Sequence, residues 1–211
     1  KKTFRNEIYD EYKANRSSSP DNFKIQIKEL QNLLSNFNIP QISLEGYEAD
    51  DVLGSLSYSF NKQNKKVTIV TGDRDSFQLI NSKTKIMYTK RGISDVEIYD
   101  NREFTNKYQI STSQYVEYLA LKGDKSDNIP GLPGVGEKTA ISLLQNYKNI
   151  SNIYKNLEEL TPKLQSNFID NKKQLMMSKD LAKIKTDLDL QIPSIDLKET
   201  VFFDNKILVQ T

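Results

Sequence analysis

The sequence predicts an α/β protein whose sheet is mostly parallel and is flanked by helices. Short apolar runs, of which "VTIV" at 67–70 is the clearest, are followed by loops and helical patterns, and this alternation favours a parallel sheet. A longer helical pattern, interrupted by a Gly/Pro segment, extends from Arg102 to about Lys183. The 211 residues contain no apolar run near the ~20 residues that cross a bilayer.

Two helices are expected before the first strand. In "FRNEIYDEYKANR", Phe4, Ile8 and Tyr12 recur every four residues and form one apolar stripe of a helix. The following "SSSP" breaks this pattern. Pro20 at a first helical position, with Ser19 as its cap, begins a second helix that ends near "NFNIP". Its apolar positions keep the helical period: Phe23, Ile27, Leu30, Leu34 and Phe37.

The next elements alternate between strands and helices. "QISLEGYEADDVLGSLSYSF" at 41–60 predicts a short strand, a Gly turn and a helix, and "KKVTIVTGDRDSFQLI" at 65–80 predicts a strand, a loop and a helical turn. "KIMYTK" and "VEIYD" are typical of the edge strands of a hairpin around Arg91 and Gly92.

The composition limits the chemistry that the chain can perform. It has no cysteine and no histidine, which excludes disulfides, thiolate or imidazole metal ligands, cysteine nucleophiles and a histidine general base. Any metal must therefore be held by oxygen atoms. Lys and Arg total 30 against 28 Asp and Glu, a net charge of +2. Attraction to nucleic acid must then come from how the charges are sorted in space.

Acidic residues gather in three clusters, "GYEADD", "TGDRD" and "GDKSDN". The first begins a helix and the second follows the carboxyl end of the strand "VTIV", where open α/β sheets build their sites. Each cluster alone is ordinary helix-start or turn chemistry. Together at one sheet edge they would repel one another unless cations such as Mg²⁺ or Mn²⁺ lay between them. The candidate ligands are Glu48, Asp50, Asp51, Asp73, Asp75, Asp124 and Asp127.

The segment "GLPGVGEKTA" at 131–140 predicts a tight turn between two helices, the second of which begins at Glu137 or Lys138. The amide groups at that helix start would face an anion, and Lys138 adds positive charge. A Walker loop is excluded because Glu137 stands between Gly136 and Lys138. A plain helix–helix connection is the alternative, but among anions a phosphodiester backbone fits better than a nucleoside triphosphate.

Four segments, in their order and spacing, closely resemble the 5′ nuclease family: "FRNEIYDEYKANR", "GYEADDVLGSL", "TIVTGDRDSFQLI" and "LKGDKSDNIPGLPGVGEKTA". This family includes the 5′–3′ exonuclease domain of bacterial DNA polymerase I, its free-standing relatives, phage 5′ nucleases and, more distantly, flap endonucleases. The resemblance covers roughly Thr3 to Leu190. It implies a PIN-like nuclease core with a helical arch and a helical subdomain that contains a helix–three-turn–helix.

The resemblance also implies roles for single residues. The seven acidic residues would hold two divalent ions, Mg²⁺ or Mn²⁺, and the hairpin carbonyls a K⁺ ion. Lys13, assisted by Arg5, would reach the scissile phosphate in catalysis, and Tyr12 would stack on a base. Without the resemblance, Tyr12 could be a core residue, and Lys13 with Arg16 a solvated basic face. The residues implied to bind DNA are Tyr12, Arg16, Gly134, Val135, Gly136, Lys138 and Thr139.

Three regions are expected from this family. Residues 1–105 form the nuclease core with the arch at 1–20, and residues 106–180 form the helical DNA-binding subdomain with a helix-hairpin-helix at 123–145. Residues 181–211 return to the core. The family pattern also has aspartates on earlier strands that this chain does not contain, so we expect N-terminal strands to be missing and the chain to be part of a longer polypeptide.

The expected activity is that of a divalent-metal-dependent 5′–3′ exonuclease or 5′-flap endonuclease. Its substrate would be DNA with a 5′ end, flap or nick during replication and repair. We expect a monomer in the bacterial cytoplasm, associated with the nucleoid and not with a membrane. Two alternatives stay open: a non-catalytic module that binds DNA junctions, and a PIN-type ribonuclease. The seven carboxylates argue against the first, and the duplex-gripping hairpin argues against the second.

Overall fold

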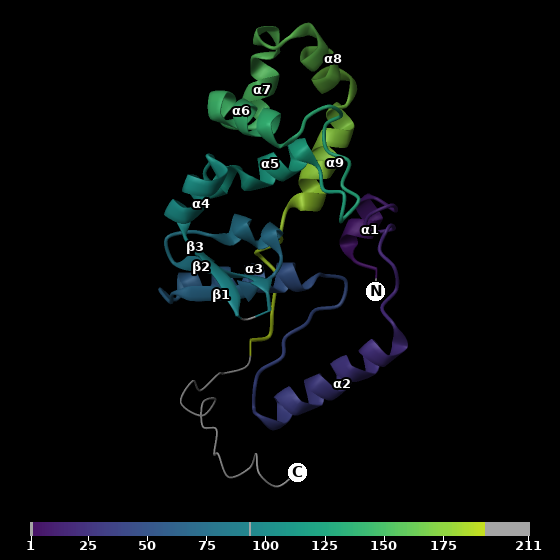
Figure 1. The fold of residues 1–211 in the computed structure, drawn as a ribbon, viewed down its shortest axis with the longest axis vertical. Helices are drawn as coiled ribbons and strands as arrows, with labels where there is room; N and C mark the ends of the chain where they lie inside the picture. The colour runs from purple at the N-terminus through teal and green to yellow at the C-terminus, as the bar shows by residue number, and fades with distance from the viewer. Residues whose placement is uncertain (1, 93, 193–211) are drawn as a thin grey trace. The chain divides into compact units, whose positions relative to one another are not determined.

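The computed structural model describes residues 2–92 and 94–192, which divide into two units (Figure 1). The main unit consists of residues 2–16 and 44–189, and the small unit of residues 17–43 and 190–192. Within the described residues the main unit contains the sheet and every helix except α2, Asp21–Asn36. Of the predicted C-terminal segment 181–211, residues 193–211 lie outside the described part.

The sheet of the main unit has three strands in the order β1 (Val67–Thr71), β2 (Thr84–Arg91) and β3 (Asp95–Tyr99). β1 and β2 are parallel, whereas β2 and β3 are antiparallel. The predicted hairpin is therefore confirmed, but β2 is the central strand and not an edge strand. Ile69 pairs with Ile86, which pairs with Tyr99, and this row of side chains is buried on the inner face of the sheet.

Helices cover the inner face of the sheet and continue beyond it. α1 is Phe4–Ile8, α3 is Ala49–Lys62, and the 3₁₀ helix η1, Arg74–Leu79, follows β1. The helical region after β3 consists of α4 (Asn101–Tyr108), η2 (Thr112–Gln114), α5 (Tyr115–Lys122), α6 (Glu137–Tyr147), α7 (Ile150–Lys155), η3 (Leu157–Glu159), α8 (Pro162–Asp170) and α9 (Lys172–Ala182). α5 packs on α9, and α6, α7 and α8 gather at the end of the unit farthest from the sheet (Figure 1). Among the described helices, none has the length and apolar character to span a membrane.

An aromatic cluster joins the sheet to this helical region. The Phe77 ring on η1 lies 4.7 Å from Tyr99 on β3, 6.1 Å from Phe104 on α4 and 6.0 Å from Tyr115 on α5, centroid to centroid. All four rings are nearly or fully buried. Tilted and edge-on ring pairs at such distances add to the stabilisation from burial. The cluster therefore fixes η1, and with it the acidic turn before it, against the helical region.

The predicted first helix is wrong in its extent. α1 stops at Ile8, and residues 9–16 form turns instead. Their backbone groups bond to the loop between α5 and α6, because the Lys13 amide donates to the Asp127 carbonyl at 3.0 Å and Asn128 donates to the Glu11 carbonyl at 2.6 Å. Ile8 is 42% exposed while Tyr12 is 4% exposed, so the expected stripe does not exist.

Two further expectations differ from the structure. Residues 41–44 form no strand, since no described strand pairs with them. α2 begins one residue later than predicted, with Pro20 at the N-cap position. α2 itself has no buried residue, and its apolar positions such as Phe23 and Leu30 are about half exposed, at 50% and 48%.

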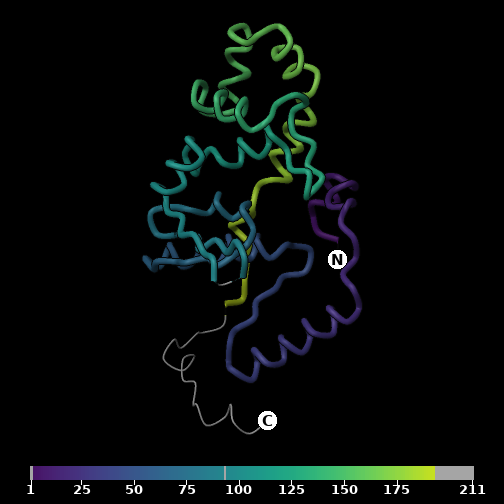
Figure 2. The backbone as a smooth tube through the Cα atoms, in the orientation of Figure 1, coloured from purple at the N-terminus to yellow at the C-terminus, as the bar shows by residue number. Residues whose placement is uncertain are grey.

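A buried ion pair connects three distant parts of the main unit. The Arg5 guanidinium on α1 donates to both carboxylate oxygens of Asp51 on α3, at 2.6 and 2.9 Å. It also donates to the carbonyls of Leu181 and Lys183, at the point where the chain leaves α9 and returns along α3 (Figure 2). The Lys185 amide donates to Asp51 as well, at 2.9 Å. Burial raises the pKa of Asp51, but these hydrogen bonds outweigh it and hold the pKa below its usual range.

Removing one partner of the Arg5–Asp51 pair should strongly destabilise this region, because the other charge stays buried. We predict that Arg5→Met lowers the free energy of unfolding by about 3–5 kcal/mol, because it leaves a buried carboxylate without its cation. Urea unfolding followed by circular dichroism measures this loss. Lys24→Met is the control, since its pair with Asp21 is exposed, and we expect at most ~1 kcal/mol there. Equal losses in the two variants would contradict this role of Arg5.

Candidate active site

Each acidic cluster is placed by a separate structural element of the main unit. Glu48 is the N-cap of α3, and the Asp51 side chain accepts a hydrogen bond from the Glu48 amide at 3.1 Å. Asp73 follows β1 as the N-cap of η1 and accepts from the Asp75 amide at 2.9 Å. Asp124 lies in the loop after α5, where it accepts from Ser126. Local capping therefore orients one carboxylate in each cluster.

The three clusters face one another closely enough to change one another's protonation. Burial raises the pKa of Asp75 to about 8, helped by the nearby charges of Asp73, Asp124, Asp127 and Asp50. Burial and the charge of Asp73 also raise the pKa of Asp50, although the Ser76 hydroxyl, which donates to Asp50 at 3.1 Å, opposes this shift. Acidic residues from all three sequence clusters therefore lie close enough together to interact electrostatically.

Three of the seven acidic residues already have cationic partners. Asp51 is fully buried against Arg5. The Glu48 carboxylate lies 2.7 Å from the Lys13 ammonium, and Asp127 is paired with Lys13 at 3.3 Å and with Arg16. This arrangement gives Asp51 and Arg5 a structural role, and no contact of the described residues supports the predicted metal role of Asp51 or the catalytic role of Arg5. The ligand roles of Glu48 and Asp127 stay predictions.

The other four acidic residues form no salt bridge with any described residue. They are Asp50, Asp73, Asp75 and Asp124. Their oxygen donors and the absence of a cationic partner fit a hard divalent cation, which would relieve the repulsion among them. No three acidic side chains within residues 2–92 and 94–192 form a ready-made metal-binding group. The fit therefore rests on donor chemistry and charge.

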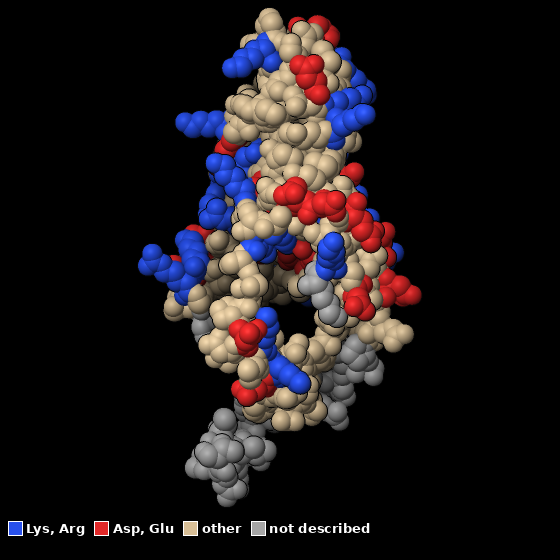
Figure 3. Space-filling view, turned by 90° about the vertical axis from the view of Figure 1, so that its right-hand side faces the viewer, with Lys and Arg blue, Asp and Glu red and all other residues tan. Residues whose placement is uncertain are grey.

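A cleft of about 400 Å³ lies beside these acids. Lys13 and Arg16 line it together with Glu48, Asp50 and Asp73. Cationic and anionic side chains thus line the same cleft. Across the face of the molecule in Figure 3, acidic side chains gather in a band through the middle, and Lys and Arg side chains stand mostly above and beside it.

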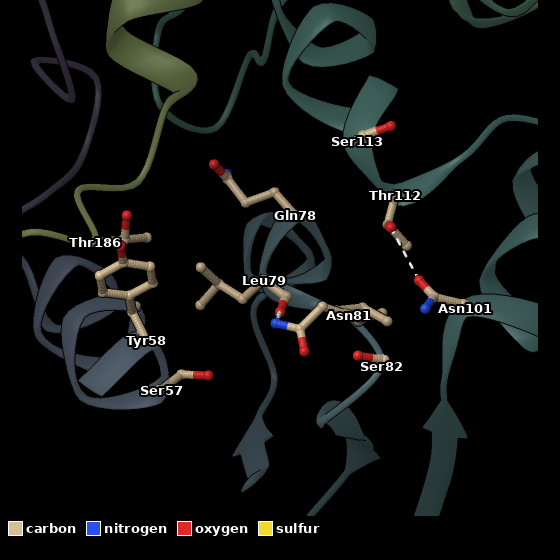
Figure 4. Close-up of a pocket in the computed structure, with 12 residues that line it drawn as sticks. Ser57, Tyr58, Gln78, Leu79, Asn81, Ser82, Asn101, Thr112, Ser113 and Thr186 are labelled. Carbon is tan, nitrogen blue, oxygen red and sulfur yellow. Dashed lines mark hydrogen bonds between the residues drawn. The ribbon is translucent and has the colours of Figure 1, made fainter. Parts of the chain in front are cut away.

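A second cavity, of about 390 Å³, has a different chemical character (Figure 4). It lies between α3, η1 and η2, and its lining includes Ser57, Gln78, Asn81 and Thr112 but no charged side chain and none of the seven acids. In Figure 4 the Thr112 hydroxyl bonds to Asn101 at 3.0 Å. Because it offers no charge to a phosphate or a metal ion, it does not belong to the acidic site.

The structure places Tyr12 inside the protein, where the predicted stacking on a base is not possible without rearrangement. Its side chain is 4% exposed, and its hydroxyl lies 3.1 Å from Glu48 Oε2 and 3.2 Å from Asp127 Oδ2. Lys13, the next residue, has a φ of 57°, and this left-handed turn directs the chain past both carboxylates. Arg16 stays half exposed at the edge of the cleft.

Two glycines shape the hairpin at 123–145: Gly123, which the sequence analysis did not single out, and Gly131, which it considered only as part of the loop whose carbonyls would hold a K⁺ ion. Gly123 (φ 73°) ends α5 and Gly131 (φ 66°) crosses directly over it. A Cβ on Gly131 would lie 2.5 Å from the Gly123 nitrogen, and a Cβ on Gly123 would lie 2.6 Å from the Ile129 carbonyl oxygen. The position of Gly123 directly after an apolar helix was the available signal, because glycine is common where helices end.

The predicted DNA-binding residues of the hairpin differ in exposure. Gly134, Gly136, Lys138 and Thr139 are exposed, whereas the Val135 side chain is 5% exposed and packs in the core. Val135 could therefore contact DNA through its backbone but not through its side chain. Gly136 is the N-cap of α6, and the first hydrogen bond of that helix joins the Ala140 amide to the Gly136 carbonyl at 2.9 Å. The amides of residues 137–139 precede it and lack a partner within the helix.

The fold and the acidic site define an α/β protein with a helical region whose hairpin presents amides beside a cluster of carboxylates. Family models match the whole described chain: "5'-3' exonuclease, N-terminal resolvase-like domain" at residues 1–109 and "5'-3' exonuclease, C-terminal SAM fold" at residues 110–202. The chain belongs to the 5′–3′ exonuclease family.

Curated relatives agree with this assignment. The chain is 38% identical over 208 residues to a 5'-3' exonuclease of Buchnera aphidicola subsp. Acyrthosiphon pisum, covering 94% of this chain and 71% of that protein. It is 42% identical over 196 residues to DNA polymerase I of Caldicellulosiruptor bescii, covering 92% of this chain but 23% of the polymerase. The chain thus spans about a quarter of the DNA polymerase I relatives and nearly three quarters of the smaller exonuclease.

Solved structures show the same fold at lower identity. The T5 D15 protein, co-crystallised with metal ions, matches with a TM-score of 0.70 and 22% identity over 86% of this chain and 70% of that chain. The catalytic core of Rad2, in complex with a DNA substrate, matches with a TM-score of 0.54 and 22% identity over 86% of this chain and 61% of that chain.

The close approach of Gly123 and Gly131 can be tested by comparing the stability of three Gly→Ala variants. We predict that Gly131→Ala lowers the free energy of unfolding by more than ~2 kcal/mol, because it combines a positive φ with a backbone clash. Gly92→Ala has the positive φ but open space and should cost about 1 kcal/mol, and Gly136→Ala has neither and should cost at most about 1 kcal/mol, through the poorer N-cap that Ala provides for α6. Denaturant unfolding of the three variants checks this order. A Gly131→Ala loss no larger than that of Gly92→Ala would show that the backbones can separate.

Proposed function

We propose that the protein is a divalent-metal-dependent nuclease that hydrolyses DNA phosphodiesters from a 5′ end or at a 5′ flap. The observation that carries this proposal is the meeting of three acidic clusters beside a cleft that Lys13 and Arg16 also line. Family membership and the relatives named 5'-3' exonuclease support the reaction. The metal ions and DNA bound in the structural neighbours support the cofactor and the substrate class.

Acidic and basic residues of this chain would have different roles: the acidic residues would bind metal ions, and the basic residues would bind the phosphate. Asp50, Asp73, Asp75 and Asp124 would hold the divalent ions, which we propose to be two Mg²⁺ or Mn²⁺ ions. Bound ions would stabilise the charge on the phosphoryl oxygens. Lys13 and Arg16 line the same cleft and would hold the negative phosphate close to the carboxylates that otherwise repel it.

The hairpin would hold the duplex at a fixed distance from this cleft. The open amides at the start of α6 and the exposed ammonium of Lys138 suit the phosphate backbone, which carries no sequence information. We also propose that carbonyls of the hairpin at 123–145 bind a K⁺ ion. The protein would act as a monomer and would be located with bacterial DNA in the cytoplasm. DNA with a nick or a flap presents both the duplex for the hairpin and the 5′ strand for the cleft.

The acidic site should be needed for cutting but not for holding DNA. We predict that Asp73→Ala in the complete protein lowers turnover on a labelled 5′-flap substrate in Mg²⁺ by at least about a hundredfold, since it removes an exposed carboxylate without a cationic partner. Flap binding in Ca²⁺, measured by fluorescence anisotropy, should change less than about threefold.

Asp95→Ala is the matched control, because Asp95 is an exposed carboxylate at the start of β3 that belongs to none of the three acidic clusters. It should leave turnover unchanged. Wild-type protein that binds the flap but does not cut it in Mg²⁺ would favour the non-catalytic junction-binding module. Cutting of single-stranded RNA in preference to the flap would favour the ribonuclease alternative.

The hairpin makes a separate prediction about salt. Lys138→Ala should weaken binding to all duplex sequences alike and make the slope of log affinity against log salt less steep by about one unit, because one phosphate contact is lost. Affinity titrations at several salt concentrations measure this slope. Lys85→Ala, on the exposed face of β2, should leave it unchanged. An unchanged slope in Lys138→Ala would assign the duplex contact to another element.

A further inference from the structure

The Tyr12 hydroxyl lies between two acidic residues that the sequence places far apart. Glu48 is 36 residues from Tyr12 and begins α3, and Asp127 is 115 residues from Tyr12 in the loop before α6. The hydroxyl lies 3.1 Å from Glu48 Oε2 and 3.2 Å from Asp127 Oδ2, so its single proton is shared between two carboxylates. No other hydroxyl of the described residues bridges two of the acidic clusters in this way.

Burial limits what this phenol can contact. The side chain is 4% exposed, and its hydroxyl faces the two carboxylates and not the solvent. A buried ring of this kind presents no free face to a nucleotide base.

The backbone around Tyr12 is held to the same two segments. The Lys13 amide donates to the Asp127 carbonyl at 3.0 Å, and the Lys13 ammonium lies 2.7 Å from Glu48 and 3.3 Å from Asp127. The Asn6 side chain donates to the Tyr12 carbonyl at 3.2 Å. Tyr12 is thus fixed on both sides, and a fixed donor sets the separation of the two carboxylates that it touches.

We propose that Tyr12 is a positioning residue, which holds Glu48 and Asp127 at the separation needed for acidic clusters from α3 and from the α5–α6 loop to act as one cation site. This inference rests on the proposed metal-dependent function. It replaces the expected stacking of Tyr12 on a base with a role inside the protein. Loss of such an outer contact typically weakens metal binding by about 10- to 100-fold.

The test uses the conservative variant Tyr12→Phe in the complete protein, which keeps the ring and removes only the hydroxyl. Isothermal titration calorimetry with Ca²⁺ should show binding at least about tenfold weaker than in the wild type. Turnover on the flap substrate should fall at low Mg²⁺ and recover as Mg²⁺ is raised, with an unchanged KM for DNA at saturating Mg²⁺. A ring that stacked on a base would behave equally well as Phe, at every Mg²⁺ concentration.

Tyr154→Phe is the matched control. The Tyr154 hydroxyl on α7 donates to the Phe168 carbonyl at 2.9 Å, so this variant loses a comparable hydrogen bond without touching the acidic clusters. Its Ca²⁺ affinity should equal that of the wild type, and its unfolding midpoint should fall about as far as that of Tyr12→Phe. Equal Ca²⁺ affinity in Tyr12→Phe and wild type, or equal weakening in both variants, overturns the positioning role. A wild type that binds no Ca²⁺ and cuts in no divalent ion overturns the proposed function itself.

Discussion

The buried pair between Arg5 and Asp51 is the interaction on which the acidic site depends. It joins α1, the N-terminal turn of α3 and the chain that leaves α9. Asp51 directly follows Asp50 and lies one helical turn after Glu48, so the contact that fixes Asp51 also fixes the first acidic cluster. A buried charge pair of this kind contributes less to stability than to a defined position, since each charge is costly to bury without the other.

The repulsion among the seven acidic residues can be reduced in two ways. Lys13, Arg5 and Arg16 neutralise Glu48, Asp51 and Asp127 within the protein. The four remaining carboxylates have no such partner, and burial together with the neighbouring carboxylates raises the pKa of Asp75. A cation from solution would gain affinity by relieving the repulsion among them. The ion pairs therefore fix the position of the site, and the carboxylates without a cationic partner remain available to a metal ion.

Local patterns predicted the parts of the fold that local forces determine. The apolar run of β1, the turn around Arg91 and Gly92, and the long helical region follow from side-chain periodicity and turn chemistry. Residues 9–16 have an equally clear helical pattern, but their backbone bonds instead to Asp127 and Asn128, more than 100 positions away. Periodicity carries no information about such partners, and for the same reason it could not predict the burial of Tyr12 or the pairing of Arg5 with Asp51.

The long reach of the Arg5 contacts has a consequence for the order in which the region forms during synthesis. Its two carbonyl partners lie 176 and 178 residues later in the chain. At about 5–20 residues per second, roughly 10–35 seconds separate the synthesis of the guanidinium from that of its last acceptors. The aromatic cluster, the sheet and the contacts of Tyr12 with Glu48 and Asp127 can form in that interval, whereas Arg5 still lacks its last two acceptors. The final fixing of Arg5, and with it of Asp51, is therefore a late step that requires the chain after α9.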